Sequence, residues 1–344
     1  MKKLLTFVSA ITAGAIGTAS ADVSVSGSSN FFYASGSGDV NSTTNEESMS
    51  VVGGTLAFAM STETTNGITV SSSITVSANT DSVTTATNQG PGLGGMESIA
   101  FGMDGMTVTI GDINNAGSGT GGGGDVTSFA ATHTASITTT TNNGAAGADA
   151  AIDGIADGQG INVATSMGDV AVNATYVTVV GSGRNSLMTN TKTVGNNSGY
   201  AIDLGFSALG ASVNVAAGGS SSQVAGTANS TAAGVEVSYP ASDVLTVSAG
   251  ASAGKLAGIE VDNMFVTAAY TMDADTTLSL GYSSKDNTAA DQTTIDEERM
   301  TTVNVSRSLG GGVSIFAEYA SADYDTAGTG SSGSSVALGT TVSF

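Results

Sequence analysis

Residues 67–78 read GITVSSSITVSA, and apolar and hydroxyl side chains alternate along them with a period of two. The apolar set is Ile68, Val70, Ile74 and Val76. The hydroxyl set is Thr69, Ser71, Ser73, Thr75 and Ser77. Successive side chains of a β-strand point to opposite faces. The segment therefore predicts a strand with one apolar face and one hydroxyl-rich face.

The same alternation recurs along the whole chain and predicts sixteen strands. Their expected ranges are 22–34, 51–62, 67–78, 96–104, 105–111, 159–167, 169–180, 199–208, 210–218, 232–239, 243–253, 259–272, 275–284, 297–308, 312–323 and 334–344. An even number of antiparallel strands is typical of single-chain outer-membrane barrels. We therefore expect an all-β fold, a 16-stranded antiparallel transmembrane β-barrel.

The connections between these strands alternate between tight turns and long polar loops. The expected tight turns are 63–66, 104–105, 168–169, 209–210, 240–242, 273–274 and 309–311. The expected long loops include 35–50, 79–95, 181–198, 285–296 and 324–333. Outer-membrane barrels have short turns on the periplasmic side and long loops outside, so the alternation favours this class.

The first 21 residues have the features of a secretory signal. Lys2 and Lys3 precede an apolar stretch at 4–17, and Ala19-Ser20-Ala21 is a small-x-small cleavage site. The stretch is short for a membrane anchor of about 20 residues. We expect cleavage between Ala21 and Asp22, which divides the chain into a signal peptide, 1–21, and a barrel, 22–344.

Composition excludes several classes of protein. Cysteine is absent, so disulfides and thiolate metal sites are excluded. The formal charge is −21, and loss of Lys2 and Lys3 makes it −21 − 2 = −23. Such a chain repels nucleic acid and attracts cations. The segment after the signal holds no run of 18 apolar residues, which excludes helical spans.

The apolar face is expected to meet lipid, although a soluble β-sandwich would show the same alternation. The polar face is built mainly from small uncharged residues, whereas a soluble surface usually carries more charge. Arg299 and Arg307 fall at the two ends of one apolar face, where long side chains can reach the interfaces. The tyrosines that fall on the apolar faces, as in an aromatic girdle, are Tyr33, Tyr176, Tyr200, Tyr239, Tyr270, Tyr282 and Tyr319.

The connection 112–158 is much longer than the others, and long loops in compact proteins are usually functional. Asp149, Asp153 and Asp157 recur in it every four residues, so on a short helix they would share one face. We expect this loop to fold into the lumen; the alternative is a solvated acidic loop on the outer surface. The expected inward-facing acids of the wall are Asp203, Glu236, Glu298 and Glu318. Rings of carboxylates favour cations, so the sequence predicts a cation-preferring pore.

Catalysis and cofactors are not expected. His133 is the single histidine, so a histidine-centred triad or a two-histidine metal site has little to build on. The glycine run 121–124 lacks a following lysine and is not a phosphate loop. The acidic segment 291–298, DQTTIDEE, and the loop acids could supply oxygen ligands for Ca²⁺; no other cofactor is expected.

Four segments together resemble the Gram-negative general porin family, in particular porins of the α-proteobacterial type. These are the signal MKKLL…ASA, the first strand DVSVSGSSNFFY, the segment IAFGMDGMTVTIGDINNA at 99–116 and the end SSVALGTTVSF. The last is similar to the family's outer-membrane assembly signal, in which Val336, Leu338, Val342 and Phe344 comply and Thr340 is the weak step.

The resemblance implies a homotrimer whose subunits pack through their outer walls and whose pores are narrowed by the third loop. Carried to this chain, the loop is 112–158, and its matching acids are Asp112, Asp149, Asp153 and Asp157. The family's basic cluster opposite the loop has no clear match here, which puts its usual transverse field in doubt.

The sequence therefore predicts a porin of a Gram-negative outer membrane that passes small hydrophilic solutes and ions by passive diffusion. Its expected partners are the lipid bilayer, two further copies of the chain and the outer-membrane assembly machinery. Two alternatives stay open at this point. One is a substrate-specific channel of the same fold, and the other is a secreted or surface-attached adhesin or surface-layer protein.

Overall fold

The computed structural model describes residues 21–38, 46–78, 92–93, 98–113, 158–180, 197–222, 229–256, 259–288, 297–326 and 329–344. Its strands in chain order are β1 (Ala21–Gly38), β2 (Glu46–Glu63), β3 (Thr69–Ala78), β4 (Gly92–Leu93), β5 (Ser98–Met103), β6 (Met106–Ile113), β7 (Gly158–Met167), β8 (Val170–Val180), β9 (Asn197–Ala208), β10 (Ala211–Ser222), β11 (Ser230–Ser242), β12 (Leu245–Leu256), β13 (Ile259–Thr271), β14 (Thr276–Thr288), β15 (Glu297–Gly310), β16 (Val313–Thr326) and β17 (Thr329–Ser343). Among these residues, no helix is long and apolar enough to cross a membrane.

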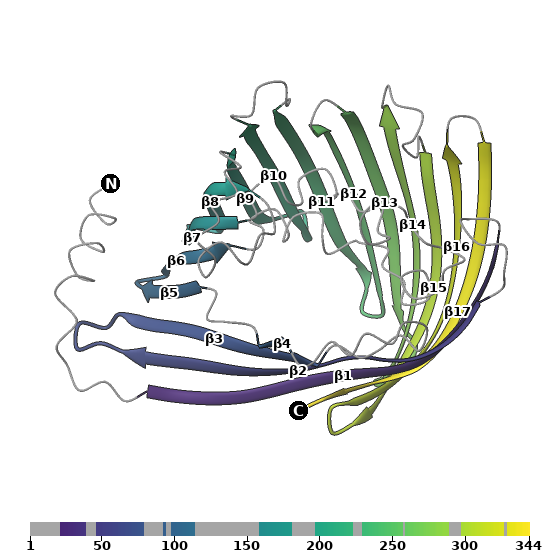
Figure 1. The fold of residues 1–344 in the computed structure, drawn as a ribbon, viewed down its shortest axis with the longest axis horizontal. Coiled ribbons are helices and arrows are strands. Elements are labelled where there is room, and N and C mark those ends of the chain that lie inside the picture. Colours follow the sequence, from purple (N-terminus) through teal and green to yellow (C-terminus); the bar gives the residue numbers. More distant parts are fainter. Residues whose placement is uncertain are drawn as a thin grey trace.

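The strands form one closed antiparallel sheet. Each long strand pairs with the next along the chain, and β17 pairs with β1 to close the ring. Figure 1 shows β1, β2 and β3 along one side of the ring and β10–β17 along the opposite wall, with β5–β9 between them. The expected 16-stranded antiparallel barrel is confirmed; β4, which is only two residues long, is an addition on the edge of β3.

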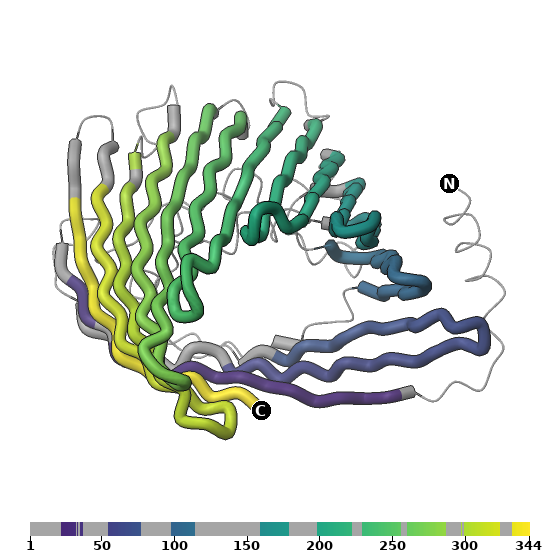
Figure 2. Tube along the Cα trace, turned by 180° about the vertical axis from the view of Figure 1, so that it is seen from behind, coloured from purple at the N-terminus to yellow at the C-terminus, as the bar shows by residue number. Residues whose placement is uncertain are grey.

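The last residue of the chain completes the closure. Phe344 and Gly27 exchange two backbone hydrogen bonds, in which the Gly27 N–H reaches the Phe344 carbonyl at 2.9 Å and the Phe344 N–H reaches the Gly27 carbonyl at 3.0 Å. Figure 2 shows the C-terminal strand beside the N-terminal one from the opposite side. A closed ring leaves no strand edge exposed to lipid, which is the condition for a sheet to span a bilayer.

Tight hairpins at one end of the barrel follow from local sequence. Asp104 and Gly105 both have positive φ, 51° and 75°, and so do Leu209 and Gly210, 53° and 81°. Two-residue hairpins favour turns with positive φ at both central positions, because these match the twist of the flanking strands. Leu209 is fully exposed and its side chain is not branched at Cβ. It can therefore adopt a positive φ with less steric conflict than a β-branched residue.

Four expected connections differ in the structure, and one is the long loop expected at 35–50, where residues 35–38 and 46–50 are strand. The expected turn at 240–242 is strand, and the chain reverses at 243–244; the turn expected at 309–311 centres on 311–312. The expected long loop 324–333 is mostly strand, since Tyr324 pairs with Ser331 and Thr326 with Thr329. Backbone groups make these pairs, so polar and glycine residues continue the ladder after the apolar alternation has ended.

The two faces of the wall differ as the alternation predicts. The outward tyrosines are each between 38% and 58% exposed, from Tyr282 to Tyr200. Arg299 and Arg307 lie on the outer face of β15 at its two ends, opposite Asp323 and Ile315 of β16. The inner face carries buried polar residues such as Asn263, Thr302 and Ser335.

Within the described residues, the pairing between β3 and β5 is short, and we call this contact the seam. These strands share three register pairs, Thr69–Gly102, Val70–Phe101 and Ser71–Ala100. Farther along β3 the next pair on this edge is Val76 with Leu93 of β4. Next to these pairs, the Ser72 hydroxyl donates to the Ser98 carbonyl oxygen at 2.7 Å and bridges the two strands.

Candidate functional site

Three buried carboxylates lie on the inner face of the barrel that the structure describes. Asp203 of β9, Glu236 of β11 and Glu318 of β16 are 8%, 6% and 4% exposed. They sit at inward positions because strand alternation turns their apolar neighbours, such as Ile202, Val235 and Tyr319, outward. The large exposed fractions of those three neighbours, 44%, 41% and 43%, agree with this assignment.

Each of these carboxylates has an asparagine opposite it on one neighbouring strand. Asp203 pairs in register with Asn173 of β8, and Glu236 with Asn214 of β10. Glu318 pairs with Asn304 of β15, whose side-chain Nδ2 donates to Glu318 Oε2 at 3.2 Å. An amide donor opposite a carboxylate stabilises it without adding a positive charge.

The other neighbour of each carboxylate is small. Asp203 faces Ala216, Glu236 faces Gly250 and Glu318 faces Ala337. Ala216 and Ala337 are 1% and 0% exposed, and the ring of Phe265 lies over Gly250. The three carboxylates are therefore packed closely into the inner wall, with an amide on one side, and they add negative charge to that wall.

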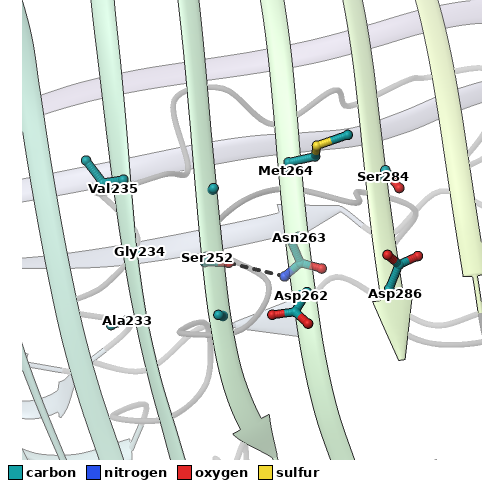
Figure 3. A pocket seen from close by; sticks show the side chains of 11 residues that line it. Ala233, Gly234, Val235, Ser252, Asp262, Asn263, Met264, Ser284 and Asp286 are labelled. Carbon is teal, nitrogen blue, oxygen red and sulfur yellow. Dashed lines mark hydrogen bonds between the residues drawn. The ribbon is translucent and has the colours of Figure 1, made fainter. Parts of the chain in front are cut away.

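Further amide and hydroxyl groups extend this polar lining. Asn162 Nδ2 donates to Asn173 Oδ1 at 2.5 Å and to Thr175 Oγ1 at 2.6 Å. Asn263 Nδ2 donates to Ser252 Oγ at 3.3 Å between β12 and β13 (Figure 3). These groups add polarity to the inner face and no charge.

Positive charge is scarce on the inner face that the structure describes. Lys285 of β14 is at an inward position, opposite Asn263 and Glu298. Lys255, Arg299 and Arg307 are at outward positions of β12 and β15. Lys255 pairs with Glu260 at 3.8 Å, and Arg299 forms an ion pair with Glu297. The basic side chains of the described wall are therefore mostly engaged on its outer face.

The opposite part of the inner face, in β1–β6, has different chemistry. A cavity of about 530 Å³ lies there, which we call the hydroxyl recess. It is lined by Asp22, Val23, Ser24, Ala59, Met60, Ser61, Ser71, Ser72, Ser73, Ser98, Ala100 and Thr109. It lies beside the seam between β3 and β5, and Asp22 is the one charged residue of this lining.

A second hollow, also of about 530 Å³, lies on the wall of β11–β14. Figure 3 shows Val235, Met264, Asp262 and Asp286 around it. Met264 and Val235 are 52% and 41% exposed, so this hollow belongs to the outer face.

Arg307 and its hydrogen-bond partners lie at the tight-turn end of the outer face. Arg307 Nη1 donates to Thr276 Oγ1 at 2.8 Å and approaches Asp273 Oδ2 at 3.4 Å. The backbone N–H of Asp275 donates to Asp273 Oδ1 at 2.9 Å. This hydrogen bond, then that of Thr276, and the Arg307 charge lower the pKa of Asp273 below its ordinary value.

The structure brings together only part of the predicted site. Asp203, Glu236 and Glu318 share the inner face, whereas Asp149, Asp153 and Asp157 lie outside the described residues. Glu298 is placed by its backbone pairing with Lys285 and Tyr324. Asp112 lies in β6 opposite Gln159 and is partly exposed. Its neighbour Ile113 is buried with Val177 and Ala201. The pore roles of these acids stay predictions.

The predicted processing and assembly signals lie next to the closure of the ring. Ala21 and Asp22 pair with Thr62 and Ser61 of β2. Val336, Leu338 and Phe344 are 47%, 54% and 76% exposed on the outer face of β17. The two roles themselves, cleavage and recognition, stay predictions.

Sequence reasoning missed the asparagine partners and the hydroxyl recess. The asparagines are far from their acids along the chain, as for Asn173 and Asp203, and only the strand register joins them. An inward Asn on the strand next to an inward acid is the signal that could have found them. The possible Ca²⁺ ligands at 291–296 lie outside the described residues. Within those residues, no three His, Asp or Glu side chains are grouped to hold a metal.

Comparisons with known proteins agree with this architecture. A family model of Gram-negative porins matches residues 6–327. No curated protein matches the sequence.

Solved structures of similar fold include an anion-selective porin from Comamonas acidovorans, at 13% identity and a TM-score of 0.69, over 94% of this chain and 100% of that one. The outer-membrane channel DcaP of Acinetobacter baumannii matches at 13% identity and a TM-score of 0.65, over 94% and 97%. In-vitro folded OmpT of Vibrio cholerae, in a trimer form, matches at 10% identity and a TM-score of 0.61, over 94% and 100%. At these identities the likeness shows the fold.

Proposed function

Because the chain belongs to the Gram-negative porin family, we propose that it forms a water-filled, cation-preferring channel for small hydrophilic solutes and ions across the outer membrane. The observation that carries the preference is the charge of the inner face. Asp203, Glu236 and Glu318 lie there, and Lys285 is the basic residue at an inward position in the described strands. Carboxylates on the wall raise the local concentration of cations and exclude anions.

The similarity to an anion-selective porin does not decide the sign of the selectivity. That protein shares 13% of its residues with this chain over the aligned region. Selectivity depends on which side chains point inward, and a shared fold leaves these free to vary. The proposal therefore depends on this chain's own inward acids.

We extend the proposal to the long connection 112–158 as the constriction of the pore, with Asp112, Asp149, Asp153 and Asp157 as its acids. The buried cluster of Ile113, Val177 and Ala201 supports it, because it anchors the start of this connection to the inner wall. Signal cleavage before Asp22 and a catalytically inactive mature chain belong to the same proposal.

We also propose a homotrimer that is inserted through recognition of the C-terminal strand. The OmpT structure of similar fold has a trimer form, and the apolar outer face offers surface for subunit packing. Phe344 and Leu338 lie on that face. Membership of the porin family removes the adhesin alternative.

Reconstitution of the refolded protein into a planar bilayer tests the proposal. Stepwise conductance in groups of three, with a zero-current potential of the sign for cations across a KCl gradient, would support the trimeric cation-preferring channel. Conductance with a potential of the opposite sign would leave a porin and remove the electrostatic part. Absence of any conductance from well-folded protein would contradict the channel itself.

A further inference from the structure

We propose that the hydroxyl recess is a subsite for small neutral polyhydroxylated solutes, such as hexoses and pentitols, on their way through the channel. The inference rests on the proposed channel function and names a substrate class within it. The recess is distinct from the carboxylate-bearing wall, because its residues come from β1, β2, β3, β5 and β6.

The first argument is the convergence of hydroxyl groups. Strand alternation turns Ser24, Ser61, Ser71, Ser73 and Thr109 towards the inside from four strands. Register pairs Ser61 with Ser71, so two of these hydroxyls lie side by side. Each hydroxyl can donate one hydrogen bond and accept others, which is also the bonding capacity of each hydroxyl of a polyol.

The second argument is the small residue between two hydroxyl-bearing positions of the recess. Ser71 of β3 pairs in register with Ala100 of β5, and Ala100 pairs with Thr109 of β6. All three residues line the recess. The single methyl group of Ala100 leaves space between the Ser71 and Thr109 hydroxyls, into which a polyol hydroxyl can reach.

The third argument is size and charge. A volume of about 530 Å³ lies within the range of roughly 300–1,000 Å³ that small-molecule pockets have. Asp22 is the one charged side chain of the described lining, and its carboxylate can accept hydrogen bonds from neighbouring hydroxyls of one solute. The described lining has no aromatic ring on which a sugar could stack, so we expect weak binding that allows rapid release into the channel.

Glucose flux into proteoliposomes tests this subsite. Initial uptake of labelled glucose is measured against glucose concentration for the wild-type protein and for the double variant Ser71→Ala, Ser73→Ala. The matched control is Ser238→Ala, Ser248→Ala, which removes a hydrogen-bonded serine pair, 2.9 Å apart, from the carboxylate-bearing wall. KCl conductance of the same preparations in planar bilayers reports whether each channel is folded and open.

We expect saturable uptake in the wild type and in the control, with half-saturation in the millimolar range. In the recess variant, half-saturation moves to a concentration at least about threefold higher, while KCl conductance is unchanged. Uptake that is linear in the wild type, or equally saturable in all three proteins, would overturn the subsite and leave the channel intact. Lack of KCl conductance in the wild type would instead overturn the proposed channel, and the subsite with it.

Discussion

Among the residues that the structure describes, the two sides of the barrel differ in their strand pairing and in the chemistry of their inner faces. On one side, all twelve residues of β12 pair with β13, and the inner face carries Glu236 and Glu318. On the other side, β3 and β5 share three register pairs, and the inner face carries the hydroxyl recess. We call these the carboxylate wall, β8–β17, and the hydroxyl wall, β1–β6.

The difference shows how one sheet can combine two permeation properties. A continuous ladder fixes the height and direction of every inward side chain, so a few carboxylates can be held in place opposite their asparagine partners. The hydroxyl wall instead offers the hydroxyl groups and the room of the recess, in whose lining Asp22 is the one charged residue. We expect ion preference to depend on the carboxylate wall and the passage of neutral solutes to depend on the hydroxyl wall.

The largest effect is expected from adding one methyl group to the tightly packed wall. A Cβ at Gly250 would meet the ring of Phe265 and lie 2.9 Å from the Val235 carbonyl oxygen. Phe265 is 1% exposed, so a shift of its ring would disturb the packing around it. Gly250→Ala should therefore destabilise the barrel by about 1–3 kcal/mol, as overpacking of cores does. The shift of the urea unfolding midpoint in detergent measures it.

The matched control lies on the hydroxyl wall. A Cβ at Gly102 would have its nearest neighbour, Thr69 Cβ, at 3.8 Å, which is ordinary contact. Gly102→Ala should change stability by less than about 0.5 kcal/mol. Equal losses in the two variants would show that the walls do not differ in packing.

A smaller effect is expected from the side chain that bridges the seam. Ser72→Ala removes the 2.7 Å hydrogen bond to the Ser98 carbonyl and leaves the three register pairs in place. The loss of one such bond costs about 1 kcal/mol. We expect faster backbone hydrogen exchange in β5, measured by mass spectrometry of peptides that cover 98–103.

Ser28→Ala is the control for this variant. The Ser28 hydroxyl forms a hydrogen bond with the Thr55 hydroxyl at 3.0 Å between β1 and β2. From this pair the backbone ladder continues without a break to the pair of Ala21 and Thr62. The exchange of β5 should not change in it. Unchanged exchange of β5 in Ser72→Ala would contradict a bridging role for this serine.

Ion preference should respond to the carboxylate wall with a modest change. Glu236→Gln combined with Glu318→Gln keeps the size of both side chains and removes two inward charges. The permeability ratio of K⁺ to Cl⁻ should fall by about twofold, read from the zero-current potential across a KCl gradient. Asp262→Asn removes an acid that lines the outer hollow of Figure 3 and should leave the ratio unchanged. A ratio that falls equally in both cases would mean that overall charge, and not the lumen wall, sets the preference.

The sequence predicts the carboxylate wall better than the hydroxyl wall, for a physical reason. Period-two alternation directly gives the side to which Asp203, Glu236 and Glu318 point, and the structure places all three inward. The seam depends on where β5 docks on β3, and that register is a non-local property of the ring. The same limit explains the misplaced turn at 240–242, because Pro240 and Ser242 still pair with Thr246 and Leu245.

The smallest effect concerns the exposed turn between β13 and β14 on the carboxylate wall. Hydrogen bonds from the Asp275 N–H and Thr276, with the Arg307 charge, hold the pKa of Asp273 below 3.8. A group whose pKa is lowered by folding contributes stability above its unfolded value, and this contribution is lost as the pH falls through its folded value. Asp273→Asn should thus lower the unfolding midpoint slightly at neutral pH, and the difference from wild type should vanish well below pH 3.8.

Arg307→Gln, which removes only the lesser charge contribution, should reproduce a fraction of the same pH-dependent loss. A difference between Asp273→Asn and wild type that stays constant across this range would mean that the turn depends on the shape of the side chain and not on its charge. The hairpin would then be specified by backbone geometry alone, as the positive-φ turns at Asp104-Gly105 and Leu209-Gly210 are.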